Sequence, residues 1–103
     1  MAWTRAAALA ELTDGCPLLA IVGDEEVALY RVNGAVYATD DLCSHAEASL
    51  AEGDLRGYII ECPRHGGAFD IRTGEPKHFP AFSPIRTFPV KIEEGSIWID
   101  TEA

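Results

Sequence analysis

The chain has 103 residues, of which 48% are hydrophobic and 24% charged, a balance typical of one small globular domain. Its formal net charge of −9 argues against nucleic acid and against an anionic membrane surface as partners, because both require a basic face. No apolar run is long enough to span a bilayer, and residues 1–5 lack the layout of a signal peptide, so we expect a cytoplasmic protein.

The predicted elements are almost all β-strands. A helix is possible only over residues 6–12, with room for two turns at most before Gly15. Apolar runs and alternation predict short strands at 18–22, 26–32, 35–39, 58–61, 88–93 and 96–100. Several short strands at close spacing are typical of an all-β fold, here a small antiparallel sandwich or barrel.

Two of the turns between these strands have the composition of β-hairpin turns. Asn33-Gly34 follows the strand at 26–32, and both residue types tolerate the positive φ that such a turn requires. Glu94-Gly95 stands in the equivalent place before the last strand. We expect a single domain, 1–103, with a framework of about 1–40 and 83–103 and an inserted subdomain of about 41–82.

Two cysteines and two histidines occur in a spacing that indicates metal binding. Cys43 and His45 are one residue apart, Cys62 and His65 are two apart, and sixteen residues separate the pairs. A chance occurrence is improbable in a chain with only three cysteines and three histidines. A structural zinc uses these ligand types, although zinc fingers place both cysteines first. An iron–sulfur cluster with two imidazoles on one iron is the other alternative.

The two loops, Cys43-Ser44-His45 and Cys62-Pro63-Arg64-His65-Gly66-Gly67-Ala68-Phe69-Asp70, resemble the two signature loops of Rieske [2Fe–2S] proteins. The resemblance implies one [2Fe–2S] cluster and the small β fold of that family. It also implies that Cys43 and Cys62 bind the inner iron, while His45 and His65 bind the outer iron near the surface. Imidazoles in place of two thiolates raise the reduction potential above that of four-cysteine ferredoxins.

Four further residues of the second loop are expected to act around the cluster. Gly66 and Gly67 allow backbone N–H groups to approach the cluster sulfurs, and Pro63 stiffens the loop by fixing φ. Arg64 is expected near the exposed tip. There it either pairs with an acidic patch on a partner or is simply solvated.

The loops depart from one branch of the family. Ala48 and Arg64 stand where respiratory and photosynthetic members have two cysteines that form a disulfide. Gly67 and Phe69 stand where those members have hydroxyl groups that donate to the cluster. Because fewer donors stabilise the reduced state less, we expect a midpoint at the low end of the roughly −150 to +300 mV range.

These departures make the chain similar to the Rieske ferredoxins of bacterial aromatic-ring dioxygenases. This resemblance implies an electron carrier, not an enzyme, that passes single electrons from a flavoprotein reductase to a terminal oxygenase. A mononuclear iron site needs two further histidines and a carboxylate, and the chain has only His78 outside the loops. The alternatives are a small Rieske subunit of another redox enzyme and a structural zinc module that mediates protein contacts. We expect a monomer.

The remaining residues of interest have ordinary roles. Cys16, beside Pro17 in an apolar stretch, is predicted to be a small buried hydrophobe. His78 is either solvated or helps to dock a partner. The acidic pairs, Asp40-Asp41 among them, are expected to be solvated.

Overall fold

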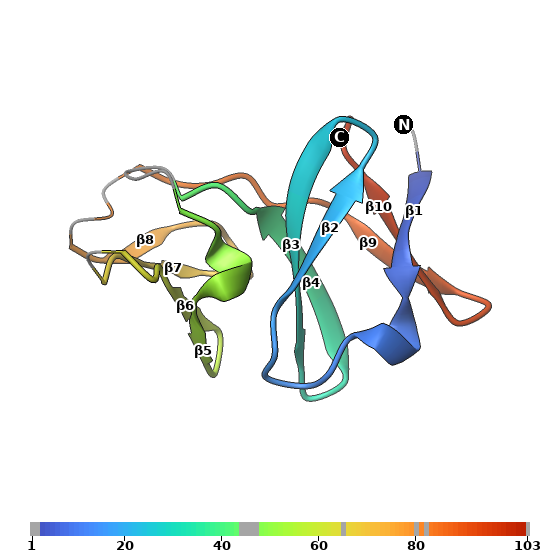
Figure 1. Ribbon diagram of the computed structural model, residues 1–103, viewed down its shortest axis with the longest axis horizontal. Helices are drawn as coiled ribbons and strands as arrows, with labels where there is room; N and C mark the ends of the chain where they lie inside the picture. Colours follow the sequence, from blue (N-terminus) through green and yellow to red (C-terminus); the bar gives the residue numbers. More distant parts are fainter. Residues whose placement is uncertain (1–2, 44–47, 65, 80, 82, 103) are drawn as a thin grey trace.

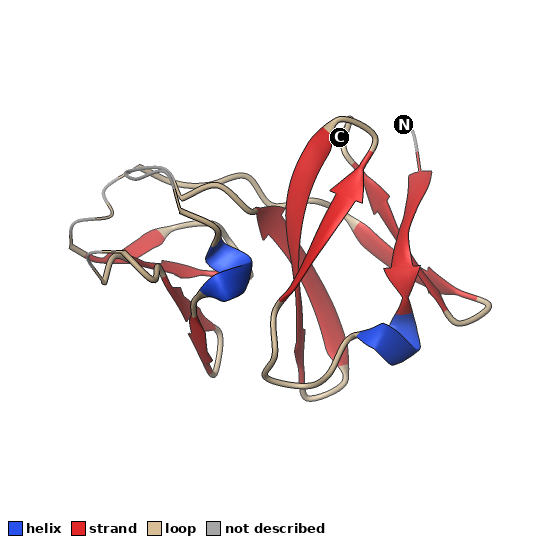
Figure 2. Ribbon diagram, in the orientation of Figure 1, coloured by secondary structure: helices blue, strands red, loops and turns tan. Residues whose placement is uncertain are grey.

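The computed structural model describes residues 3–43, 48–64, 66–79, 81 and 83–102. The elements in chain order are β1 (Trp3–Ala8), η1 (Leu9–Glu11), β2 (Leu18–Val22), β3 (Glu25–Val32), β4 (Ala35–Asp40), η2 (Leu50–Glu52), β5 (Asp54–Arg56), β6 (Ile59–Glu61), β7 (Ala68–Asp70), β8 (Pro76–His78), β9 (Val90–Glu93) and β10 (Ser96–Asp100). The two η elements are single 3₁₀ turns, and strands dominate the rest (Figure 2). The all-β prediction is therefore confirmed. No helix among the described residues is long and apolar enough to cross a membrane.

The strands form three antiparallel sheets, in the orders β1-β10-β9, β2-β3-β4 and β5-β6-β7-β8. The first two sheets pack face to face, and β1 lies beside β10, with Trp3 opposite Asp100 (Figure 1). The four-stranded sheet lies at the other end of the long axis of the molecule, which measures 39 × 26 × 19 Å (Figure 1).

Strand β3 lies between two hydrophobic cores. Val27 and Leu29 face the framework core between the first two sheets, which comprises Ala7, Leu12, Ala20, Val22, Val27, Leu29, Ala38, Phe88, Ile97 and Ile99. Ala28 and Tyr30 face the cysteine core, which comprises Ala28, Tyr30, Val32, Cys43, Leu50, Ile60, Cys62, Phe69, Ile71, Ala81 and Ile85. Because both faces of the middle of β3 are buried, residues 27–30 form a continuous apolar run instead of an alternation.

Both predicted hairpins are confirmed. Asn33 and Gly34 have φ values of 52° and 83° in the turn between β3 and β4. Glu94 and Gly95 have φ values of 51° and 74° between β9 and β10. The strand predicted from residue 88 begins instead at Val90, since the preceding proline has no N–H to donate to a sheet.

The helix that the sequence allowed over residues 6–12 does not form. Residues 3–8 form β1, and only Leu9–Glu11 make a helical turn, of the 3₁₀ kind. Pairing with β10 aligns Arg5 with Trp98 and buries Ala7, so tertiary contacts override the helix propensity of the alanine run. Strands β1, β5, β7 and β8 were not expected, and the last three have only three residues each.

The prediction for Cys16 is also wrong, since its side chain is exposed. Cys16 lies in the connection between η1 and β2, where its N–H donates to the carbonyl of Thr13 at 3.0 Å. Gly15, with φ of 80°, turns the chain just before it. The turn directs Cys16 away from the framework core, which an apolar neighbourhood in sequence does not reveal.

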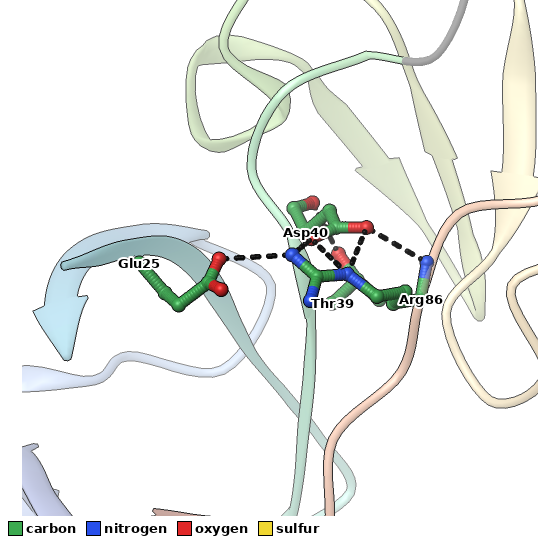
Figure 3. A network of polar contacts seen from close by, with 4 residues as sticks. All are labelled: Glu25, Thr39, Asp40 and Arg86. Atoms are coloured by element: carbon green, nitrogen blue, oxygen red, sulfur yellow. Dashed lines mark hydrogen bonds and ion pairs between the residues drawn. The ribbon is translucent and has the colours of Figure 1, made fainter. Parts of the chain in front are cut away.

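The chain leaves the framework after β4 and returns beside it near residue 86. Thr39 and Thr87 form an isolated β-bridge there. The N–H of Arg86 donates to Asp40 Oδ2 at 2.9 Å. Its guanidinium donates to Asp40 Oδ1 at 2.7 Å and to Glu25 Oε2 at 2.8 Å (Figure 3). Hydrogen bonds to Asp40 and Glu25 raise the pKa of Arg86, so this clamp stays charged.

Candidate metal centre

Two of the four predicted ligand residues lie in the same core. Cys43 and Cys62 are 3% and 1% exposed and belong to the cysteine core. Their neighbours there include Leu50, Ile60 and Phe69, each fully buried. Two thiols from separate loops thus lie in one apolar environment that excludes water.

Each of these cysteines begins a loop that a backbone hydrogen bond closes. The N–H of Cys43 donates to the carbonyl of Ala48 at 3.0 Å, and the N–H of Cys62 donates to that of Gly67 at 2.7 Å. Each loop contains one of the predicted histidine ligands. His45 and His65 lie outside the described residues, as does Ser44, so the structure brings together the two cysteines of the predicted set.

The second loop is a tight turn with an exposed tip. Gly66 has φ of 73°, a conformation that favours glycine, and its N–H donates to the carbonyl of Arg64 at 2.9 Å. Pro63 and Arg64 are exposed, whereas Gly67 is buried. The exposure of Arg64 is compatible with contact to a partner, and its docking role stays a prediction.

The first loop is attached to the framework through Asp41, a residue that sequence reasoning missed. Asp41 is 3% exposed, so the expectation that both members of the Asp40-Asp41 pair are solvated is wrong. Its carboxylate accepts a hydrogen bond from the N–H of Ala51 at 2.9 Å. An acidic pair in sequence carries no signal of this burial, because the acceptor role depends on how the chain folds back.

Gly53 is a second residue that sequence reasoning missed. Its φ of −85° is ordinary, but a Cβ at this position would overlap the carbonyl oxygen of Glu61. The absence of a side chain therefore lets the end of η2 approach the strand that leads into Cys62. Nothing in the sequence distinguishes Gly53 from a turn glycine.

The polar groups at the far side of the cysteine core form a stacked arrangement. The Arg72 guanidinium donates to the Asp70 carboxylate at 2.9 Å and lies 4.2 Å from the ring centre of Tyr58. Tyr58 makes an edge contact with Tyr37 of β4, the ring centres being 5.8 Å apart. The hydrogen bond from Arg72 lowers the pKa of Asp70. This arrangement ties the four-stranded sheet to β4.

Burial raises the pKa of Tyr30, whose hydroxyl is 2.9 Å from Thr39 Oγ1, so this phenol stays neutral inside the cysteine core. His78 is exposed on β8, with Nδ1 2.9 Å from the carbonyl oxygen of Phe79. Neither residue is placed by the structure as a metal ligand.

The donor set fits a mixed sulfur–nitrogen metal centre. Two buried thiols are the ligand type that iron–sulfur clusters require, and the two closed loops each contribute one histidine by sequence. Within the described residues no group of three or more cysteine, histidine or acidic side chains is placed to hold a metal ion. Because both histidines lie outside those residues, the four-ligand set remains a prediction from the sequence.

Comparison with known proteins points to one family. The family model of the Rieske [2Fe–2S] domain matches residues 2–89. The chain is 45% identical over 98 residues to the ferredoxin component of a naphthalene 1,2-dioxygenase system from Pseudomonas putida, a match that covers 95% of this chain and 94% of the relative.

Two solved structures resemble the fold over nearly its whole length. The Sphingomonas yanoikuyae B1 ferredoxin superposes with a TM-score of 0.90 at 46% identity, covering 94% of this chain and 96% of that one. A chain in the complex of reduced oxygenase and oxidized ferredoxin in carbazole 1,9a-dioxygenase superposes with a TM-score of 0.87 at 41% identity, covering 94% of this chain and 91% of that one.

Proposed function

Because this chain belongs to the Rieske [2Fe–2S] domain family, we propose that it carries single electrons from a flavoprotein reductase to the terminal oxygenase of an aromatic-ring dioxygenase system. The observation that carries this proposal is the similarity to a dioxygenase-system ferredoxin over 95% of the chain. Such relatives are electron carriers and not catalytic enzymes, and the same holds for this chain.

The ligand assignment is part of the proposal. Cys43 and Cys62 hold the inner iron of one [2Fe–2S] cluster, and His45 and His65 hold the outer iron. The burial of both cysteines in one apolar core supports the assignment to the inner iron. The cluster, when bound, takes up and releases one electron. The role of the chain is to keep water from the thiolates and to hold both loops closed through Ala48 and Gly67.

The organisation of the molecule follows the same proposal. A framework of about 1–40 and 83–103 carries a cluster-binding subdomain of about 41–82 within one domain, supported by the division into two cores. The protein is a cytoplasmic monomer that docks its partners at the cluster loops. Exposed side chains next to those loops support this docking face: Arg64 in the second loop, Leu42 at 59% and Phe79 at 81% exposure.

Spectroscopy of the purified protein tests the cluster. We expect red-brown protein with two irons and acid-labile sulfide per chain, an EPR signal of an imidazole-ligated cluster after reduction, and a midpoint potential below about zero. Colourless protein with stoichiometric zinc, after anaerobic expression with sufficient iron, would contradict the proposal and favour the structural zinc module. A midpoint above about zero would contradict the argument from the missing hydroxyl donors at Gly67 and Phe69.

Reconstitution separates a mobile carrier from a fixed subunit of another redox enzyme. A mobile carrier is reduced and oxidised repeatedly. When it is mixed with a reductase and an excess of oxygenase, far less than one carrier per oxygenase should therefore support many oxygenase turnovers. A subunit instead co-purifies with its enzyme at a fixed ratio and does not exchange.

A further inference from the structure

Asp41 connects three segments of the chain at the base of the first loop. Its N–H donates to the carbonyl of Glu26 at 3.2 Å, next to the start of β3. Its carbonyl accepts from the N–H of Leu50 at 2.7 Å, and its carboxylate Oδ1 accepts from the N–H of Ala51 at 2.9 Å. The residue is 3% exposed. One buried residue therefore joins the framework, the turn η2 and the chain that leads into Cys43, through its backbone and its carboxylate.

The turn η2 lacks the cap that its own sequence offers. Ser49 occupies the N-cap position, where a serine hydroxyl commonly accepts from the first free N–H groups. Here the Ser49 side chain makes no capping bond, and its Oγ is buried with no hydrogen-bond partner. The N–H groups of Leu50 and Ala51 donate to Asp41 instead. Asp41 thus supplies the cap from outside the turn.

This outside cap is one of three ties that close the first loop. The innermost tie is the hydrogen bond from Cys43 to Ala48, and the next is the bridge between Leu42 and Ser49. The outermost consists of the two bonds to Asp41. The bond from Ala51 to the Asp41 carboxylate is the only one of these bonds that uses a side chain, so it is the one that a substitution at Asp41 removes. Since Leu50 is fully buried in the same core as Cys43, loosening η2 disturbs the packing around that thiol.

We propose that Asp41 is a positioning residue for the metal centre: its carboxylate caps η2 and thereby holds the first ligand loop closed around Cys43. The inference rests on the proposed function, because it assigns the loop to a cluster.

Three variants of the full-length holoprotein test this positioning role. Asp41→Ala removes the acceptor and the charge, and Asp41→Asn keeps an acceptor oxygen without the charge. Asp54→Asn is the matched control, since Asp54 is exposed on β5 and no hydrogen bond of its side chain is present among the described residues. We expect bleaching of the visible absorbance by a chelator to be about ten times faster in Asp41→Ala, and within about threefold of wild type in Asp41→Asn.

If the chelator bleaches Asp41→Ala and Asp54→Asn at the same rate, the positioning role is overturned. The same conclusion follows if Asp41→Ala and Asp41→Asn are bleached at the same rate. Amide hydrogen exchange at Ala51, whose N–H donates to the Asp41 carboxylate, gives a readout that needs no cluster. We expect loss of protection there in Asp41→Ala and retention in Asp41→Asn, and unchanged exchange in Asp41→Ala overturns the cap. A wild-type protein without iron and sulfide would instead refute the proposed function, while the exchange data still decide the cap.

Discussion

The framework and the side that holds the cysteines are stabilised in different ways. Framework strands β1 to β4 have five to eight residues and enclose a core made of apolar side chains. Strands β5 to β8 have three residues each, too few to form a stable sheet without other support. That side depends on the core shared with β3 and on single contacts made by Asp41, Gly53 and Arg86.

This difference predicts which property a mutation in each region should change. A large apolar core spreads its stabilisation over many contacts, so one truncation weakens the whole domain in proportion to the side chain removed. A loop held by a few specific bonds fails locally when one bond is lost, and metal binding then contributes much of its order. Damage to the framework should therefore lower stability, whereas damage to the cysteine side should first release the cluster.

The largest effect is expected from the cysteines. Cys62→Ala removes the thiol of a proposed ligand from the cysteine core and should abolish iron and sulfide binding completely. Cys16→Ala is the control, because Cys16 is exposed and outside the proposed set. Iron analysis and EPR measure the outcome. A Cys62→Ala protein that keeps the EPR signal of wild type would remove Cys62 from the ligand set.

The framework should respond to truncation of Leu29, which is fully buried on β3. Leu29→Ala should lower the free energy of unfolding by about 2–5 kcal/mol, through lost apolar burial and the cavity that remains. Chemical denaturation at pH 7 measures this loss, and the folded variant should keep its full iron content. Release of iron from the folded variant would show that the stability of the framework and the retention of the cluster are coupled.

On the cysteine side, Gly53→Ala should disturb the loops through a steric clash. The new Cβ overlaps the carbonyl oxygen of Glu61, which should cost about 1–3 kcal/mol and speed the loss of iron to a chelator. Gly57→Ala is the control: its φ of 61° disfavours alanine, but open space surrounds the added methyl. Comparable iron loss in both variants would contradict the role given to Gly53.

The clamp at the junction should have a smaller effect. Arg86→Ala removes the hydrogen bonds to Asp40 and Glu25 and should destabilise the protein by about 1 kcal/mol, since all three groups are partly solvated. Arg86→Lys should lose part of this, because lysine cannot form the forked contact. Thermal unfolding at low and high salt measures the loss of stability in each variant. The loss in Arg86→Ala should be smaller at about 1 M salt, because salt screens the ion pairs. A deficit independent of salt would assign the effect to packing.

The smallest effect concerns pH. The hydrogen bond from Arg72 lowers the pKa of Asp70 from its ordinary value of 3.8, so its carboxylate stabilises the folded state above that value. The contribution is lost as pH falls through the lowered folded pKa. Asp70→Asn should therefore be less stable than wild type by up to about 1 kcal/mol at pH 7, and the difference should vanish in strong acid. Denaturation curves of both proteins over pH 2–7 measure this, and the difference in unfolding free energy between wild type and Asp70→Asn at each pH cancels the effect of cluster loss in acid. A stability difference that grows as the pH falls would contradict the predicted direction.

Much of the fold was predictable because its signals are local. Asn33-Gly34 and Glu94-Gly95 determine hairpins through their own φ preferences, and β2 and β10 follow from short apolar runs. The ligand spacing is equally local, and it directed the family assignment that residues 2–89 bear out. The assignment of the four ligand residues to the two irons remains a proposal, since His45 and His65 lie outside the described residues.

Other features were decided only when distant segments met. The alanine run before Leu9 is a strand because β10 lies beside it, and Cys16 is exposed because a turn directs it outward. Asp41 became a buried cap and Gly53 a point of backbone contact only when the chain folded back toward β3 and Glu61. The amino-acid sequence alone determined the turns, the strands with clear apolar patterns and the chemistry of the donor set, because these depend on neighbours in the chain. Tertiary structure decided which groups are buried and which acceptors they meet, because burial depends on residues far away in sequence.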